Sequence, residues 1–181
     1  SRFLGANEHK KASHCCAFCI WTTTVSAFLY GIFMLLFRPV LMPVLGANEE
    51  TLPLASSYLF WTIGIGAVPT VLNPALAHLI RAEGYSKQAS FGVAFGGVLN
   101  ILLDPLFIYG LRLQITGAAI ATLISNTIAM LYFLHFIWKI RATSVLTLSP
   151  RMYRITDHIP SEVLSIGLPS FLISMMGTVS N

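Results

Sequence analysis

The stretch from Gln88 to Leu111, QASFGVAFGGVLNILLDPLFIYGL, contains one charged residue, Asp104, and is otherwise uncharged. It exceeds the roughly 20 residues that a helix needs to cross a bilayer. A charged side chain in hydrocarbon costs at least ~2.5–3.5 kcal/mol, so such residues are usually retained for handling ions, protons or substrates. This stretch therefore predicts a membrane helix with a functional carboxylate.

The neighbours of Asp104 add oxygen atoms to the same place. Asn100 precedes Asp104 by four residues, so the two side chains share one face of a helix. Pro105 has no N–H and cannot bond back to the carbonyl of Ile101. The spacing predicts a site made of a carboxylate, an amide and a main-chain carbonyl.

Composition indicates a membrane protein throughout. Apolar residues make up 55% of the chain and charged residues 10%, with a mean hydropathy of +0.74, whereas globular proteins have about 25% charged residues. The runs do not alternate apolar and polar residues as barrel strands do. We predict an all-α, polytopic helical bundle whose spans are residues 15–37, 52–80, 88–111, 113–138 and a fifth within 159–181.

Basic residues predict the orientation. If the five segments alternate in direction, nine of the eleven Lys and Arg residues fall on one side, which the positive-inside rule makes cytoplasmic. The predicted cytoplasmic loops are 1–14, 81–87 and 139–162. The net charge of +4 then reflects topology and contact with anionic lipid, and no nucleic-acid partner is expected.

Both ends suggest a fragment. The chain begins with Ser1 rather than Met, and it stops inside the fifth apolar segment. Helices that end within the membrane would leave faces covered only by lipid. The expected partners therefore include the missing remainder of the same chain.

Small residues and prolines predict how the helices pack. Gly92 with Gly96, and Gly117 with Ala121, form small-x-x-x-small pairs that allow helix backbones to approach closely. Prolines inside the predicted spans indicate bent helices. They are Pro69, Pro74 and Pro169.

A depth estimate groups four polar residues. At a rise of ~1.5 Å per residue, Asp104 lies about 10 Å and Asn100 about 16 Å below the outer end of their predicted segment. By the same rise, Tyr58 and Thr122 lie about 9 and 14 Å below the outer ends of theirs. Each role has a structural alternative. Asp104 could be a paired structural carboxylate, Tyr58 an interfacial aromatic, and Thr122 a packing residue bonded to its own helix.

Other reactive side chains carry weaker signals. Cys15, Cys16 and Cys19 lie together at a membrane entry without a fourth ligand, which favours free thiols over a metal site. His78 and His135 lie near the cytoplasmic ends of their segments, where a polar tip reaches the headgroups.

Several motifs carry a family resemblance. NILLDPLFI (100–108), followed by GAAIAT (117–122), resembles the fifth- and sixth-helix motifs of multidrug and toxic compound extrusion (MATE) transporters. RAEG (81–84) resembles the end of the fourth helix of that family, and IGLP (166–169) the start of the seventh. SRFLGANEHKKA (1–12) is similar to the segment after the second helix.

The resemblance implies an antiporter of twelve helices in two six-helix lobes, which exchanges Na⁺ or H⁺ for cationic or amphipathic drugs or metabolites. Residues 1–158 would then be most of the first lobe, and 159–181 a truncated first helix of the second. It also implies the plasma membrane of a bacterium and no enzymatic activity.

The family site implies roles for four residues. Asn100, Asp104 and Thr122 match the residues that engage the coupling cation, and Tyr58 matches a tyrosine of the fourth helix. The family's first-helix Asp lies outside this sequence. No cofactor or resident metal is implied, only Na⁺ or H⁺, with transient Na⁺ at Asp104.

Two alternatives remain. A lipid-linked oligosaccharide flippase of the same superfamily would be expected to have cationic residues in its cavity for pyrophosphate, and the predicted spans have none. A membrane enzyme would pair Asp104 with a histidine as acid and base, but His78 and His135 are expected at the opposite membrane face, roughly 23–29 Å away.

Overall fold

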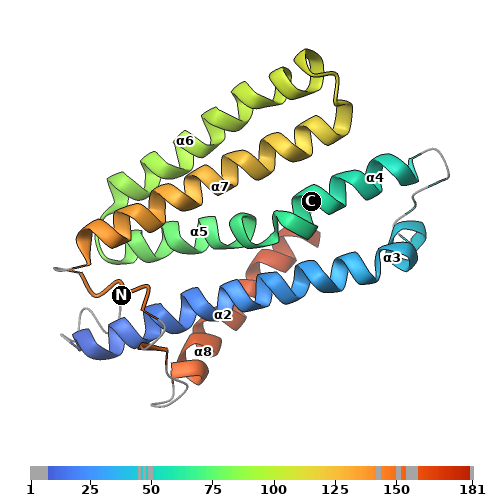
Figure 1. Ribbon diagram of the computed structural model, residues 1–181. Coiled ribbons are helices and arrows are strands. Elements are labelled where there is room, and N and C mark those ends of the chain that lie inside the picture. The colour runs from blue at the N-terminus through green and yellow to red at the C-terminus, as the bar shows by residue number, and fades with distance from the viewer. Residues whose placement is uncertain are drawn as a thin grey trace.

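The computed structural model describes residues 8–44, 46, 48, 51–141, 144–149, 152–153 and 159–179. Within these residues all regular structure is helical, which confirms the predicted fold class. Helices α2, α5, α6 and α7 run with their long axes broadly aligned, whereas α8 is inclined to them (Figure 1). In chain order they are α2 (His9–Leu36), α3 (Arg38–Val44), α4 (Leu52–Leu59), η1 (Phe60–Ile65), α5 (Ala67–Ala82), α6 (Ser86–Pro105), η2 (Leu106–Gly110), α7 (Gln114–Ile140) and α8 (Ile159–Val179).

Three of these helical segments are long and apolar enough to cross a membrane: α2, α6 with η2, and α7. They lie over the predicted spans 15–37, 88–111 and 113–138. Their outward faces carry exposed apolar side chains, such as Ile101 and Leu131, at the positions that lipid would contact. The described part of the chain is thus a multi-pass helical membrane protein.

The span predicted at 52–80 is broken. The helices Leu52–Ile65 and Ala67–Ala82 are bent by 52° relative to one another and count as a fourth span if taken together. Within the π-helical turn η1, the N–H of Gly66 bonds to the carbonyl of Trp61 at 3.0 Å. Pro69 cannot donate to the carbonyl of Ile65, so the prediction of a bent helix holds at this position.

Helices α6 and α7 pack closely because glycines face bulky residues. A Cβ added at Gly92 would lie 2.4 Å from the ring of Phe133, and one at Gly96 would lie 3.0 Å from Ala129. A Cβ at Gly117 would lie 2.8 Å from the backbone of Phe107. These contacts confirm the close approach predicted from the small residues.

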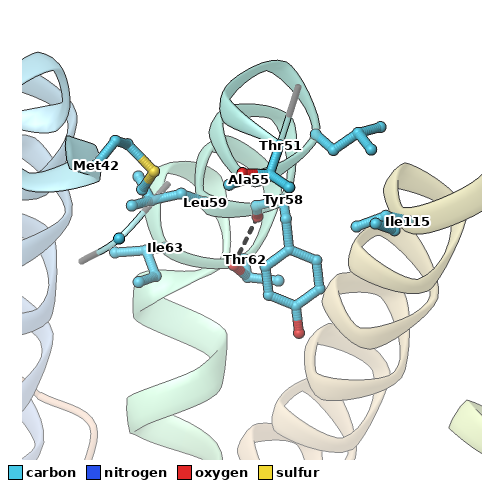
Figure 2. Close-up of a pocket in the computed structure, with 10 residues that line it drawn as sticks. Met42, Thr51, Ala55, Tyr58, Leu59, Thr62, Ile63 and Ile115 are labelled. Carbon is cyan, nitrogen blue, oxygen red and sulfur yellow. Dashed lines mark hydrogen bonds between the residues drawn. The ribbon is translucent and has the colours of Figure 1, made fainter. Parts of the chain in front are cut away.

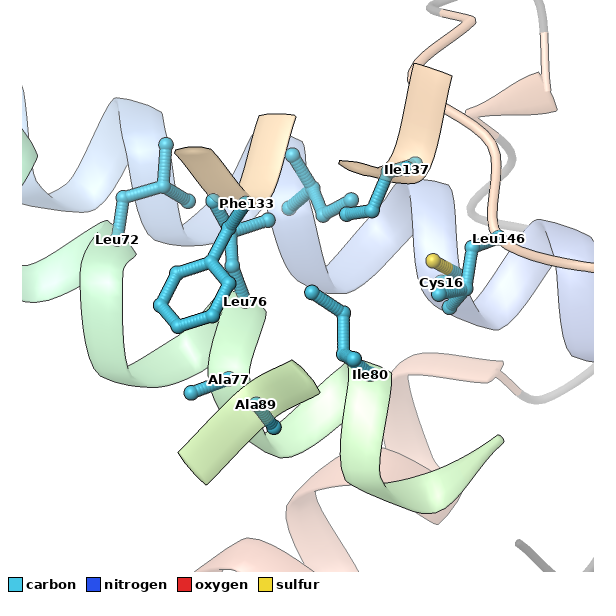
Figure 3. Packing of buried hydrophobic residues seen from close by; sticks show 10 residues of the cluster. Cys16, Leu72, Leu76, Ala77, Ile80, Ala89, Phe133, Ile137 and Leu146 are labelled. Atoms are coloured by element: carbon cyan, nitrogen blue, oxygen red, sulfur yellow. The ribbon is translucent and has the colours of Figure 1, made fainter. Parts of the chain in front are cut away.

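A cluster of buried apolar residues lies toward the end of the bundle at which α5 ends and α6 begins (Figures 1 and 3). Side chains from α2, α5, α6 and α7 meet there, and one residue comes from the segment after α7. The members are Cys16, Ile20, Leu72, Leu76, Ala77, Ile80, Ala89, Phe133, Ile137 and Leu146.

Helix α8 contacts α2 and corresponds to the fifth predicted segment, within residues 159–181. Its described apolar part, Ile159–Ile173, is shorter than a full span. The division into lobes at residues 158 and 159 stays a prediction. Residues 1–7, the first part of the family motif at 1–12, lie outside the described residues.

Candidate functional site: a polar cluster between α6 and α7

Three of the four predicted site residues are joined by hydrogen bonds. The side-chain amide of Asn100 donates to Oδ1 of Asp104 at 3.3 Å and to the hydroxyl of Thr122 at 3.5 Å. Both distances are longer than the roughly 2.7–3.2 Å of a typical N–H···O bond, so both contacts are weak. Asn100 therefore links the carboxylate on α6 to the hydroxyl on α7.

Local sequence positions these side chains. Asn100 and Asp104 are one helical turn apart on α6, and their bond is the i,i+4 contact that such spacing allows. Directly after Asp104, the helix passes through Pro105 into the π-helical turn η2, and the N–H of Leu106 bonds to Leu103. Neither Pro105 nor Leu106 thus donates to the carbonyl of Ile101, as the sequence predicted.

The charge of Asp104 has no ion-pair partner in the described part of the chain. Its side chain is partly buried at membrane depth, and its hydrogen-bond partner there is the neutral amide of Asn100. The described contacts therefore do not support the alternative of a paired structural carboxylate.

The Thr122 hydroxyl differs from those of other helical threonines. Thr24, Thr62 and Thr127 each donate to the carbonyl four residues earlier in their own helix. Thr122 instead accepts a bond from Asn100 of the neighbouring helix. The alternative of a packing residue bonded to its own helix is therefore not the arrangement that the structure describes.

Tyr58 lies on α4 and has no described hydrogen bond to the other three residues; it is 42% exposed. It lines a cavity of about 450 Å³ between α3, α4, η1 and the start of α7 (Figure 2). It also lines a second cavity of about 470 Å³ with Ile108, Ile115 and Ala118. Since Ile108 belongs to η2, Tyr58 lies near the turn that follows Asp104 but outside the hydrogen-bonded cluster.

A second polar cluster was missed in the sequence. Asn73 donates its amide to Oδ1 of Asn126 at 3.0 Å, and Asn126 donates to the Thr70 hydroxyl at 3.4 Å. Asn126 follows Thr122 by four residues, so both clusters lie along one face of α7. The four-residue spacing of Thr122 and Asn126 was the signal in the sequence that could have indicated this cluster. Finding its other members also required knowing that α5 packs on α7.

One atom of this cluster has no partner. Oδ1 of Asn73 is buried without a hydrogen bond among the described residues. Buried polar atoms are nearly always paired, so this acceptor is an exception within the cluster.

The remaining candidates lie elsewhere. Cys15, Cys16 and Cys19 lie on α2 and form no disulfide bond, and no group of three His, Cys, Asp or Glu residues within the described segments is arranged to hold a metal ion. His78 and His135 are exposed, and the ring of His135 lies 6.1 Å from that of Trp138.

The chain is similar to multidrug export proteins. Multidrug export protein MepA of Staphylococcus aureus (strain NCTC 8325 / PS 47) is 32% identical over 176 residues, which are 97% of this chain and 38% of MepA. MepA of Staphylococcus saprophyticus is 31% identical over the same shares of the two chains. The chain thus spans little more than a third of these relatives.

Solved structures of the family have the same fold. An outward-facing multidrug resistance MATE transporter superposes with a TM-score of 0.89 at 28% identity, covering 98% of this chain and 39% of the transporter. An inward-facing one gives 0.86 at 28% identity, covering 94% and 38%. The MatE family profile matches residues 1–106 of the 181. The chain therefore belongs to the MatE family, a family of membrane transporters rather than enzymes.

Proposed function

We propose that this chain is part of a cation-coupled antiporter that exports drugs or metabolites across the plasma membrane. Asp104, Asn100 and Thr122 would hold the coupling Na⁺ or H⁺. The names of the MepA relatives support drug export, and the polar cluster of the chain itself supports the coupling.

The observation that carries this proposal is the state of Asp104. It is a carboxylate at membrane depth whose described partner is a neutral amide. Its negative charge is balanced when a proton, a metal cation or a cationic substrate binds. Oxygen atoms of Asp104, Asn100 and Thr122 are suitable ligands for a hard cation such as Na⁺.

Competition for one carboxylate yields exchange. When the coupling cation neutralises Asp104, the attraction of the site for a cationic drug falls, and neighbouring helices can repack around a neutral group. When the cation leaves, the charge returns and the site again favours the drug. Inward cation flow and outward drug movement are thereby linked through Asp104.

The surroundings supply space for an amphipathic substrate. The cavities on either side of Tyr58 are lined mainly by apolar residues, including Leu54, Leu59, Ile63 and Ile115. Drug sites are mostly apolar with a few polar groups. We propose that a substrate places its apolar part beside Tyr58 and its cationic part toward Asp104.

The test is ethidium or norfloxacin efflux from cells that express the full-length protein, with Na⁺ varied at fixed pH. Asp104→Asn should abolish efflux because the amide neither titrates nor carries a charge. Glu8→Gln is the control, since Glu8 is an exposed carboxylate paired with Lys11 at 2.9 Å. Efflux by Asp104→Asn at the wild-type rate would show that coupling does not use this carboxylate.

Wild-type behaviour identifies the coupling ion and tests the flippase alternative. Dependence of efflux on Na⁺ at constant pH assigns Na⁺, and dependence on pH alone assigns H⁺. A well-expressed wild-type protein that exports no drug but moves lipid-linked oligosaccharide would replace the proposal with the flippase. No described contact favours that alternative.

A further inference from the structure

We propose that Glu83 is a positioning residue of the transport cycle, because it fastens the linker between α7 and α8 to the end of α5. The linker means here its described residues, 144–149 and 152–153. The inference rests on the proposed function for its role in transport, whereas the fastening itself is argued from contacts.

Helix α5 ends so as to hold Glu83 in place. Gly84 has a φ of +98°, its N–H bonds to Arg81 at 3.0 Å, and the N–H of Tyr85 bonds to Ile80 at 3.2 Å. This pair of bonds around a left-handed glycine is a Schellman motif. It ends the helix at Ala82, directly before the C-cap residue Glu83, and fixes the Glu83 backbone.

Both carboxylate oxygens of Glu83 bind the linker. Oε1 accepts the N–H of Val145 at 2.8 Å, and Oε2 accepts the hydroxyl of Ser144. The Ser144 hydroxyl oxygen in turn accepts the N–H of Leu146 at 2.9 Å. Glu83 has no described ion pair, so its charge is stabilised by these charge-assisted hydrogen bonds.

An apolar contact reinforces the attachment. Leu146 is 4% exposed and lies in the buried cluster with Cys16, Ile80 and Ile137 (Figure 3). Placing that side chain in the cluster requires the backbone of residues 144–146 to turn inward. The Glu83 carboxylate satisfies the Val145 N–H that this turn brings toward the protein.

The far end of the linker is attached to a different helix. Nδ1 of His14 on α2 lies 2.8 Å from the carbonyl oxygen of Met152. The ring of Tyr153 stacks on Phe18, with centroids 5.7 Å apart. The linker is therefore held at one end by α5 and at the other by α2.

This attachment shortens the tether to α8. If the linker were free, the whole segment between α7 and α8 would act as a flexible tether and allow many placements of α8. With the linker held on α2 and α5, fewer placements remain. In an alternating-access transporter, Glu83 would thus restrict the arrangements of α8 relative to α2, α5 and α7 that occur during the cycle.

The test measures amide hydrogen exchange and transport in the complete transporter. Glu83→Gln removes the charge and replaces one accepting oxygen with a donor. We expect exchange at Val145 and Leu146 to rise about tenfold, which corresponds to the loss of one charge-assisted hydrogen bond. Drug turnover should fall several-fold with an unchanged drug Kd, because the substrate site is not altered.

Two further variants make the result decisive. Ser144→Ala removes one of the two bonds to Glu83 and also the acceptor of the Leu146 N–H, so exchange should rise at Leu146 but less at Val145 than in Glu83→Gln. Glu8→Gln, a change to another carboxylate, should have no effect. Wild-type exchange at Val145 in Glu83→Gln would overturn the attachment. Faster exchange with wild-type turnover would overturn its role in transport.

The test is separable from that of the cation site. Asp104→Asn should lose transport and keep slow exchange in the linker. If Asp104→Asn transports normally, the proposed coupling fails while the exchange data still decide the attachment by Glu83.

Discussion

Asn100 and Thr122, on adjacent antiparallel helices, are joined by a hydrogen bond of 3.5 Å from the amide to the hydroxyl. The bond places an α7 oxygen beside a carboxylate that belongs to α6. It exists because α6 and α7 approach closely at their glycines. Helix packing and the composition of the candidate site are therefore linked.

Thr122→Val tests the contribution of the hydroxyl to cation binding. Valine has nearly the same shape but supplies no oxygen, so we expect the apparent affinity for the coupling cation to fall about tenfold, with a loss of roughly 1–2 kcal/mol. The measurement is the cation dependence of efflux. Thr127→Val is the matched control, since the Thr127 hydroxyl bonds to Leu123 of its own helix; equal effects of the two variants would contradict the assigned role.

Gly92→Ala tests the packing of α6 on α7. The new methyl would lie 2.4 Å from the Phe133 ring, and overpacking of this kind costs about 1–3 kcal/mol. We expect a lower Tm in detergent. Gly97→Ala is the control because no atom lies within 4 Å of a Cβ there, and its Tm should stay or rise. Partial recovery in Gly92→Ala combined with Phe133→Leu would assign the loss to this contact.

Asn126→Leu tests the second polar cluster. The change removes the acceptor of the partly buried Asn73 amide and the donor to the exposed Thr70 hydroxyl. The Asn73 amide left unpaired costs about 1–3 kcal/mol. We expect a fall in Tm, with part of it recovered in the double variant Asn73→Leu, Asn126→Leu. A double-mutant cycle of Tm measures the coupling, and strictly additive effects would mean that the two amides do not interact.

Leu146→Ala tests how strongly the linker is packed. Truncating a fully buried leucine costs about 2–5 kcal/mol, and the loss should appear as a lower Tm together with faster exchange in the linker. Leu131→Ala is the control, since Leu131 on α7 is 54% exposed. The expectation fails if the two variants lose the same stability.

Much of the fold could be predicted because membrane helices are set by local composition. Apolar runs predicted α6 with η2 and α7 to within a few residues, whereas α2 begins six residues before its predicted start, at His9. The bend at Gly66 was less accessible: Pro69 indicated it, but its 52° angle depends on how α4 and α5 pack against neighbouring helices.

The candidate site was predictable where its members share a helix. Asn100 and Asp104 follow from spacing on α6, and the motif around Thr122 gave a third member. Asn73 and Asn126 were missed because they come from helices whose contact is not encoded in any local pattern. Tyr58 was grouped with them by estimated depth alone, and depth does not fix which face of a helix a residue occupies.

The sequence by itself determined that the chain spans a membrane, where its long helices lie and that Asp104 is an unusual charge, because the cost of placing polar groups in hydrocarbon acts residue by residue. Tertiary structure alone decided which oxygens surround Asp104 and that Glu83 holds Ser144 and Val145. Those contacts join residues far apart in the chain, and they depend on helix crossings set by side-chain volume at the interfaces.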